Sequence, residues 1–207
     1  MCYKLEPDFI KEPFPKDKVY SVYLSQLDTI ERSTISSDVK DQDRAIENSM
    51  DIGFKLFPII ESISLNILGK RNAREYLKKL GYSGMESDIM YSMFRNGMLH
   101  TTNPYELKFE NGVVSWGLMS SSGSGGFPPH FPGYKNVDNP ELNRPSDKAF
   151  TYERLSNGDF HASLSLSSLL AQIRYDLTER LKNDKRDKIE IVVGQRINHK
   201  IPPPSEK

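Results

Sequence analysis

The feature that most constrains the fold is a run of apolar residues at helical spacing through the first half of the chain. Between residues 17 and 36, apolar side chains recur every three or four positions, which is the period of one face of an α-helix. The same period is found over 41–69, 70–80 and about 83–100, and again over 166–183. Helices with one apolar face bury that face by packing against one another. The sequence therefore predicts a helical bundle as the main core.

The sequence also marks where these helices end or are interrupted. Gly69 and Gly81 follow the second and third apolar stripes, and glycine is common directly after a helix. Pro58 lies inside the second stripe, where its missing N–H predicts a kink or a short break. The face that the fourth helix is expected to bury consists of Ile89, Met90, Met93 and Phe94.

Two segments with alternating apolar and polar residues predict β-hairpins. One covers 105–118 around an Asn-Gly dipeptide at 111–112, and the other covers 149–164 around an Asn-Gly at 157–158. Asn-Gly favours the tight turns that join antiparallel strands. Between the hairpins, 120–148 is rich in Ser, Gly and Pro. Its Ser-Gly run can be interpreted as a phosphate cradle or, in the absence of a following helix and Lys-Ser/Thr pair, as a linker.

These elements predict one α+β domain, mainly α, with small antiparallel hairpins inserted before the closing helix. The domain is expected at 17–187, after an extended Pro-containing segment at 1–16. Residues 188–207 are expected to form an edge strand followed by a disordered Pro-rich tail. The parts of the domain are a helical core at 17–104 and 166–183, and the hairpins with the long loop at 105–164.

Composition excludes several classes of protein. The chain has 28 basic and 28 acidic residues, which argues against a nonspecific nucleic-acid coat protein but allows a nuclease with a local basic patch. Cys2 is the only cysteine, so no internal disulfide forms, and no Cys/His spacing suggests a metal site. No cofactor fingerprint, apolar run of membrane-spanning length or secretory signal is found. We therefore expect a cytoplasmic protein without cofactor or metal.

The segment from Arg95 to His100 combines side chains that suit phosphate chemistry. Arg95 can clamp a phosphate with two N–H groups, and Asn96 can orient a neighbouring group by hydrogen bonding. His100 can take or give a proton near pH 7. Basic residues are also favoured at helix C-termini, so an ordinary solvated helix end explains Arg95 and His100 equally well.

The spacing within this motif raises a geometric question. At about 100° per residue, Asn96 and His100 share one face of a helix, whereas Arg95 and His100 lie about 140° apart. The three side chains meet on one phosphate only if the helix bends at Gly97 or if a second copy completes the site across a two-fold axis. The second option predicts a homodimer.

A dense basic segment lies upstream of the motif. Its residues are Lys70, Arg71, Arg74, Lys78 and Lys79, with Glu75 as the one acid among them. A charge run of this kind is usually a solvated face. It is also the dense basic segment nearest to the motif in sequence, and if the chain binds RNA, we expect the RNA backbone to lie here.

RNA cleavage by internal attack is the reaction that the motif suits best. The RNA 2′-hydroxyl is a built-in nucleophile that DNA lacks. His100 would act as general base or acid, and Arg95 would hold the scissile phosphate and stabilise the charge of the transition state. The expected products are a 2′,3′-cyclic phosphate and a 5′-hydroxyl, formed without a metal.

The segment from Phe94 to His100 resembles the signature of the HEPN superfamily. That signature is an arginine, four to six residues and a histidine near the end of a helix, often with a polar residue directly after the arginine. The likeness covers the helical region at 17–104 and the helix at 166–183, and the run 160–170 resembles the closing part of the HEPN domain. The resemblance implies a mainly helical bundle that dimerises, with paired motifs forming a cleft.

The resemblance also implies a function and an active site. Many members are metal-independent endoribonucleases in toxin–antitoxin, phage-defence or RNA-processing systems, and an antitoxin or other protein partner is therefore expected. Arg95, Asn96 and His100 carry over as the catalytic residues. Members paired with nucleotidyltransferase antitoxins often have a modified tyrosine two residues after the histidine. This chain has Thr102 there, and its nearest tyrosine is Tyr105.

Two alternatives stay open at the level of sequence. The first is a noncatalytic HEPN-like module that binds RNA or a protein, in which the arginine and histidine stabilise a dimer interface or hold a phosphate. The second is an α+β interaction protein in which residues 95–100 are only a helix end. Cleavage requires Arg95 and His100 in one solvent-open cleft, which distinguishes these alternatives from a nuclease.

Overall fold

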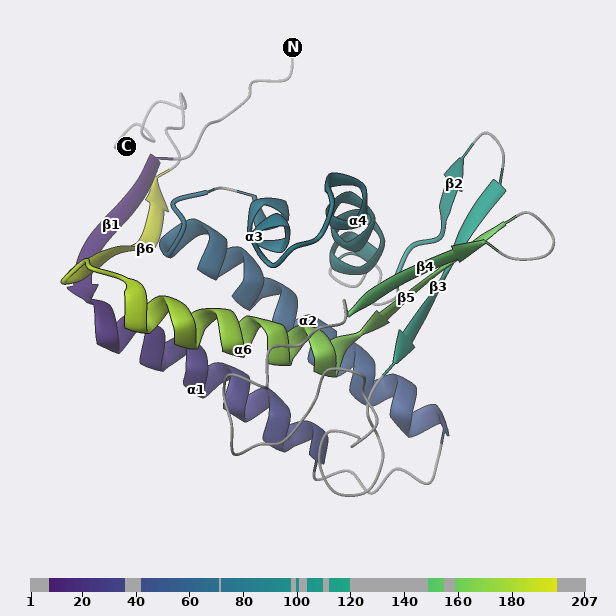
Figure 1. Cartoon of the computed structure of the whole chain (residues 1–207), viewed down its shortest axis with the longest axis horizontal. Helices are drawn as coiled ribbons and strands as arrows, with labels where there is room; N and C mark the ends of the chain where they lie inside the picture. The colour runs from purple at the N-terminus through teal and green to yellow at the C-terminus, as the bar shows by residue number, and fades with distance from the viewer. Residues whose placement is uncertain are drawn as a thin grey trace, which may run out of the picture.

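The structure is a computed structural model of the whole chain, and it is mainly helical with two small sheets (Figure 1). The residues it describes are 8–35, 42–70, 72–97, 100, 104–109, 112–119, 149–154 and 159–196. The expected coarse class, α+β with mainly helix, is confirmed. The long loop at 120–148 and the tail at 197–207 lie outside the described residues.

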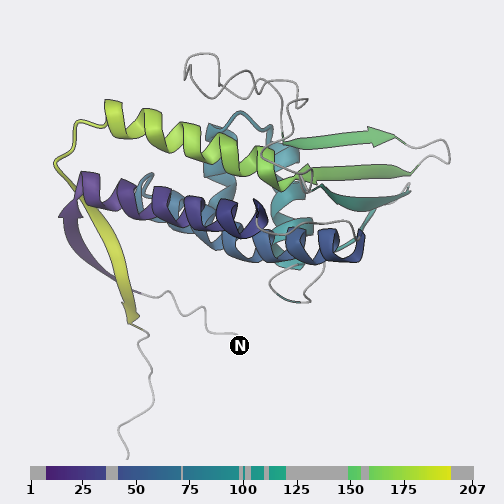
Figure 2. The same cartoon turned by 90° about the horizontal axis from the view of Figure 1, so that it is seen from below.

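Three long helices form the core. They are α1 (Lys16–Ile35), α2 (Gln42–Asn66) and α6 (Leu166–Asn183), which lie along one another in both views (Figures 1 and 2). Their apolar stripes face inward, because burial of these side chains is the largest favourable contribution to folding. Fully buried side chains of this core include Leu27, Leu56, Ile60, Ile63, Leu169, Ile173 and Leu177. The helix expected at 166–183 has these bounds in the structure.

Helix α2 continues through Pro58 without the short break that the sequence suggested. Proline removes the N–H that would bond to the carbonyl of Phe54, one turn earlier. Pro58 is exposed, so water can satisfy such a carbonyl, and the buried residues on the opposite face keep the helix in place.

Three short helical segments follow α2 and cover one side of the bundle. They are α3 (Ala73–Lys79), α4 (Gly84–Ile89) and η1 (Met90–Asn96). Ser83 begins α4 with a capping box in which the backbone N–H of Glu86 bonds to the Ser83 hydroxyl and the Glu86 carboxylate accepts from the Ser83 N–H. Gly81 has a φ of 100°, a conformation that favours glycine after a helix.

The fourth predicted helix differs from expectation in its winding. The sequence predicts a regular α-helix over about 83–100, whereas η1 is a π-helix, in which the N–H of residue i+5 bonds to the carbonyl of residue i. The expected buried face is confirmed, since Ile89, Met90, Met93 and Phe94 are all buried. Arg95 and Asn96 of the motif lie within this π-helical segment.

The two predicted hairpins are present and belong to one four-stranded sheet. Strands β2 (Leu107–Phe109) and β3 (Gly112–Met119) pair antiparallel, as do β4 (Phe150–Arg154) and β5 (Phe160–Ser165). The expectation of purely antiparallel insertions is wrong, because β3 and β5 pair in parallel and give the order β2-β3-β5-β4. Parallel neighbours need a long connection, and the long segment between the hairpins supplies one.

A second sheet lies at the opposite end of the bundle (Figure 1). It pairs β1 (Asp8–Pro15) antiparallel with β6 (Lys188–Arg196), and Phe14 and Ile191 pack against the core. The extended N-terminal segment and the last strand were expected as separate elements. They are instead partners, and each supplies the backbone groups that the other must pair with.

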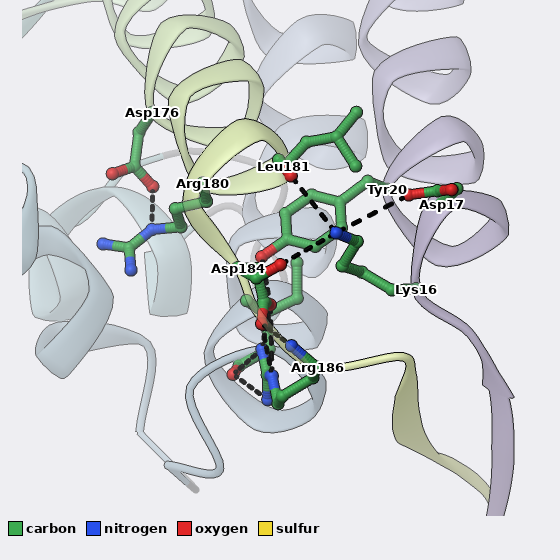
Figure 3. Close-up of polar contacts among 9 residues, drawn as sticks. Lys16, Asp17, Tyr20, Asp176, Arg180, Leu181, Asp184 and Arg186 are labelled. Carbon is green, nitrogen blue, oxygen red and sulfur yellow. Dashed lines mark hydrogen bonds and ion pairs between the residues drawn. The ribbon is translucent and has the colours of Figure 1, made fainter.

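Polar contacts around Asp184 fix the end of α6 to α1 and to the connection that leads into β6 (Figure 3). We call Lys16, Tyr20, Asp184 and Arg186 the Asp184 cluster. The Tyr20 hydroxyl donates to Asp184 Oδ2 at 3.0 Å, and Arg186 donates to both carboxylate oxygens, from Nε to Oδ1 at 2.9 Å and from Nη2 to Oδ2 at 2.6 Å. Lys16 Nζ donates to the Asp184 carbonyl at 2.8 Å. The hydrogen bonds from Arg186 hold the pKa of Asp184 well below its usual range.

Candidate functional site

The Arg95 end of η1 packs against α2 and α3 and gathers polar side chains from four elements. We call this group the Arg95 cluster. Its members are Glu61, Arg74, Asp88, Tyr91, Ser92, Arg95 and Asn96.

Arg95 is held by an acid, an amide and an aromatic ring. Its Nε donates to Glu61 Oε1 at 2.6 Å, and its Nη1 donates to Asn96 Oδ1 at 2.9 Å. The guanidinium carbon lies 5.1 Å from the centre of the Tyr91 ring, within the range of a cation–π contact. The Arg95 side chain is 20% exposed. Within the described part of the chain, no contact involves Nη2, so this N–H group is free to bind a ligand.

The surroundings of Arg95 favour its protonated, positively charged form. Partial burial by itself would lower the pKa of Arg95, but the hydrogen bond and negative charge of Glu61 outweigh it and raise the pKa above its ordinary value. The site therefore contains a permanently charged guanidinium, and its contacts with Glu61 and Asn96 fix its orientation.

A second arginine reaches the same aromatic ring from α3. The Arg74 guanidinium lies 4.6 Å from the centre of the Tyr91 ring, and its Nε lies 3.0 Å from Asp88 Oδ1. Its Nη2 lies 3.5 Å from the Ser92 hydroxyl, at the limit of hydrogen bonding. Two guanidinium groups thus make cation–π contacts with the same ring, and each also pairs with a carboxylate that offsets its charge.

The basic segment and the motif are neighbours in space because of Arg74. Lys70, Lys78 and Lys79 are exposed, and Lys78 makes a surface ion pair with Glu75 at 3.0 Å. Arg71 lies outside the described residues. Of the candidate RNA-binding residues in the described part of the chain, Arg74 therefore belongs to the Arg95 cluster, and the three lysines are exposed.

The structure brings Arg95 and Asn96 together but does not bring His100 to them. His100 is helical and exposed, and it makes no contact with Arg95 or Asn96 among the interactions of the described residues. The π-winding of η1 ends at Asn96. Within the described residues, the arginine and the histidine are therefore not in contact.

Two members of the cluster, Glu61 and Tyr91, were not identified as site residues from the sequence. Glu61 is 34 residues from Arg95 and flanks the apolar stripe of α2, where an acid normally faces solvent. Tyr91 lies four residues before Arg95, and this spacing, which places side chains side by side on a helix, could have identified it. Arg74 was expected as part of a charged face or of an RNA-binding segment, but not as a neighbour of Arg95.

The described residues show neither a metal site nor a membrane-spanning helix. No group of three or more His, Cys, Asp or Glu side chains within the described residues is arranged to hold a metal ion. Among those residues no helix has the length and apolar character needed to cross a membrane. No family model, curated protein or solved structure matches this chain.

Proposed function

We propose that the chain is a metal-independent endoribonuclease of HEPN type, acting as a homodimer on single-stranded RNA. Its catalytic residues would be Arg95, Asn96 and His100, and the RNA backbone would follow Lys70, Arg71, Arg74, Lys78 and Lys79. By the HEPN resemblance alone, the proposal extends to a cytoplasmic toxin or phage-defence effector with an antitoxin or other protein partner.

The observation that carries the proposal is that Arg95 is held in one orientation while one of its N–H groups stays available for an anion. Glu61 and Asn96 fix two of its nitrogens, and Nη2 has no partner among the described residues. An arginine in an ordinary solvated helix end would have no reason to be anchored by an acid from another helix. A preoriented guanidinium with an unused N–H group suits phosphate binding.

The proposed reaction needs only protein groups and the RNA itself. A His100 imidazole accepts the proton of the 2′-hydroxyl as the 2′ oxygen attacks the phosphorus. The bond from phosphorus to the 5′ oxygen breaks, and that oxygen takes a proton from an acid, leaving a 2′,3′-cyclic phosphate and a 5′-hydroxyl. Arg95 Nη2 binds a nonbridging oxygen, whose negative charge grows in the transition state. The proton that His100 has taken up is then available to the departing 5′ oxygen, so each site needs one His100.

The separation of His100 from Arg95 within one chain supports completion of the site by a second copy. A two-fold axis next to the end of η1 would place Arg95 of one protomer near His100 of its partner. The same separation favours the second candidate function, a noncatalytic RNA-binding module in which Arg95 and the lysines hold phosphate.

Cleavage of a labelled single-stranded RNA in EDTA tests the proposal. Wild-type protein is expected to give fragments with 2′,3′-cyclic phosphate ends, and His100→Ala is expected to give none. His161→Ala is a matched control, because His161 lies on β5 and bonds to the Ser115 hydroxyl at 2.9 Å, away from the cluster. Binding of RNA without cleavage would support the module instead, and equal cleavage by His100→Ala would contradict the assignment of the site.

A mixed dimer tests whether two chains share one site. Arg95→Ala and His100→Ala chains, carrying different tags, are co-expressed and the heterodimer is purified with both tags. If each site takes its arginine from one chain and its histidine from the other, one of two sites is intact and about half the wild-type activity is expected. A site formed within one chain gives no activity in the heterodimer, which would overturn the shared site.

A further inference from the structure

A pocket of about 460 Å³ lies between α1, α2 and the β1–β6 sheet, and none of its lining residues belongs to the Arg95 cluster. Its walls are mainly apolar and include Phe14, Val22, Ile59 and Ile191. Val22 is 49% exposed, which is high for a large apolar side chain and shows that the pocket opens to solvent. The volume lies within the range of small-molecule binding sites.

Three polar side chains on the pocket lining form a hydrogen-bonded trio. The Tyr23 hydroxyl lies 2.7 Å from the Ser62 hydroxyl, and Asn66 Nδ2 lies 2.9 Å and 3.1 Å from these two oxygens. The Asn66 amide is oriented by the backbone, since its Oδ1 accepts from the Val192 N–H at 3.0 Å. The trio is therefore fixed by its own contacts and by β6.

The number of hydrogens in the trio exceeds the number of its contacts. Tyr23 and Ser62 contribute one hydroxyl hydrogen each, and the Asn66 amide contributes two. The three contacts among these groups use at most three of the four hydrogens. At least one hydrogen is left without an acceptor among the described residues, and a part-buried donor of this kind can bind a ligand that brings an acceptor.

The charge of the pocket lining indicates which kind of hydrogen-bond acceptor a ligand should carry. Lys18 is the one lining residue with a full charge at neutral pH, and no carboxylate lines the pocket. Lys18 and Gln26 mark two ends of the pocket along α1, and eight residues of helix span about 12 Å. The lining thus offers an elongated apolar wall, a hydrogen-bond donor and a cation.

We propose that this pocket binds a small hydrophobic monocarboxylate. The apolar body of the ligand would lie against Val22 and Ile59, and its carboxylate would accept the remaining hydrogen of the Tyr23–Ser62–Asn66 trio. Lys18, on a flexible stem, would offset the negative charge. The proposal is independent of RNA cleavage, because it uses no residue of the Arg95 cluster.

Calorimetric titration of the full chain with decanoate, below its micellar concentration, tests the proposal. 1-Decanol is the uncharged probe of the same chain length. Val22→Trp fills the mouth of the pocket and is expected to weaken decanoate binding about tenfold or more. Ser25→Trp is the matched control, because Ser25 is exposed on α1 and does not line the pocket, and it should leave binding unchanged. Thermal melting verifies that both variants fold.

A charge variant separates the carboxylate from the apolar body. Lys18→Gln is expected to weaken decanoate binding about threefold and to leave 1-decanol binding unchanged. Absence of decanoate binding to the folded wild-type protein up to about 1 mM would overturn the site. Equal losses in Val22→Trp and Ser25→Trp would also overturn it. Decanol binding as tight as decanoate binding, with no effect of Lys18→Gln, would overturn the carboxylate assignment.

Discussion

The Asp184 cluster and the Arg95 cluster contain the same kinds of side chain but differ in how much of their hydrogen-bonding capacity the protein uses. Each joins an arginine, a carboxylate and a tyrosine from two parts of the chain. Asp184 receives Arg186 on both oxygens and Tyr20 on one, and Arg186 also donates to the Ile67 carbonyl at 3.2 Å. The Asp184 side chain is 11% exposed. Its hydrogen-bonding capacity is largely used within the protein, as expected of a structural joint (Figure 3).

The Arg95 cluster leaves part of its capacity unused. Arg95 donates to Glu61 from Nε and to Asn96 from Nη1, while Nη2 has no contact within the described residues. Anchoring of this kind fixes a guanidinium and still lets it bind an anion. The comparison is consistent with the proposal that the Arg95 cluster, whose partners orient an arginine without saturating it, binds an anion.

The largest expected effect is the loss of cleavage on removing Arg95. Arg95→Ala should lower kcat/KM for RNA by about 10²–10³, since it removes a donor that acts on transition-state charge. Arg186→Ala, in the Asp184 cluster, should lower the melting temperature and leave kcat/KM unchanged for the folded protein. Single-turnover kinetics and thermal melting on both variants measure the two effects. Similar losses of activity in both variants would remove the distinction between the clusters.

The second effect is on stability at the other end of the molecule. Asp184→Asn should lower the free energy of unfolding by about 2–3 kcal/mol, because Arg186 and Tyr20 lose a shared charged acceptor. Asp17→Asn is the control, since Asp17 is 85% exposed and lies 3.9 Å from Lys16, and its change should stay below about 0.5 kcal/mol. Urea denaturation measures both, and equal changes would show that the Asp184 cluster contributes no special stability.

The pH dependence of stability follows from the same carboxylate. The pKa of Asp184 is held well below its usual range by Arg186 in the folded chain, so folding is favoured when Asp184 is ionised. Its contribution is fully present above the ordinary aspartate pKa of about 4 and is lost as the pH falls through the lower, folded-state pKa. Melting temperatures from pH 7 to pH 2 should fall more steeply for the wild type than for Asp184→Asn. Parallel curves would contradict the assignment.

The smallest expected effect concerns the aromatic ring between the two arginines. Tyr91→Leu removes both cation–π contacts and should cost about 1 kcal/mol of stability. Tyr91→Phe keeps the ring and removes only a 3.5 Å contact with Glu61, so it should be nearly neutral. Urea denaturation compares them. A larger loss in Tyr91→Phe would assign the contribution of Tyr91 to its hydroxyl instead of its ring.

Local pattern was sufficient to predict most elements of this fold. The bounds of α6, the buried face of η1 and both hairpins follow from apolar period and Asn-Gly turns, which depend on residues close in sequence. The residues of the candidate motif were also identified locally, because Arg95 and Asn96 are adjacent. The contact of Asn96 with Arg95 is of this local kind.

The sequence by itself determined which segments are helices and strands, which faces they bury and where an arginine, an amide and a histidine follow one another. Only the tertiary structure decided the parallel pairing of β3 with β5, the pairing of β1 with β6, and the contact of Glu61 with Arg95. Each of these joins groups more than 30 residues apart. Such contacts depend on how whole elements pack, and packing is set by the shapes and unpaired groups of all the elements together.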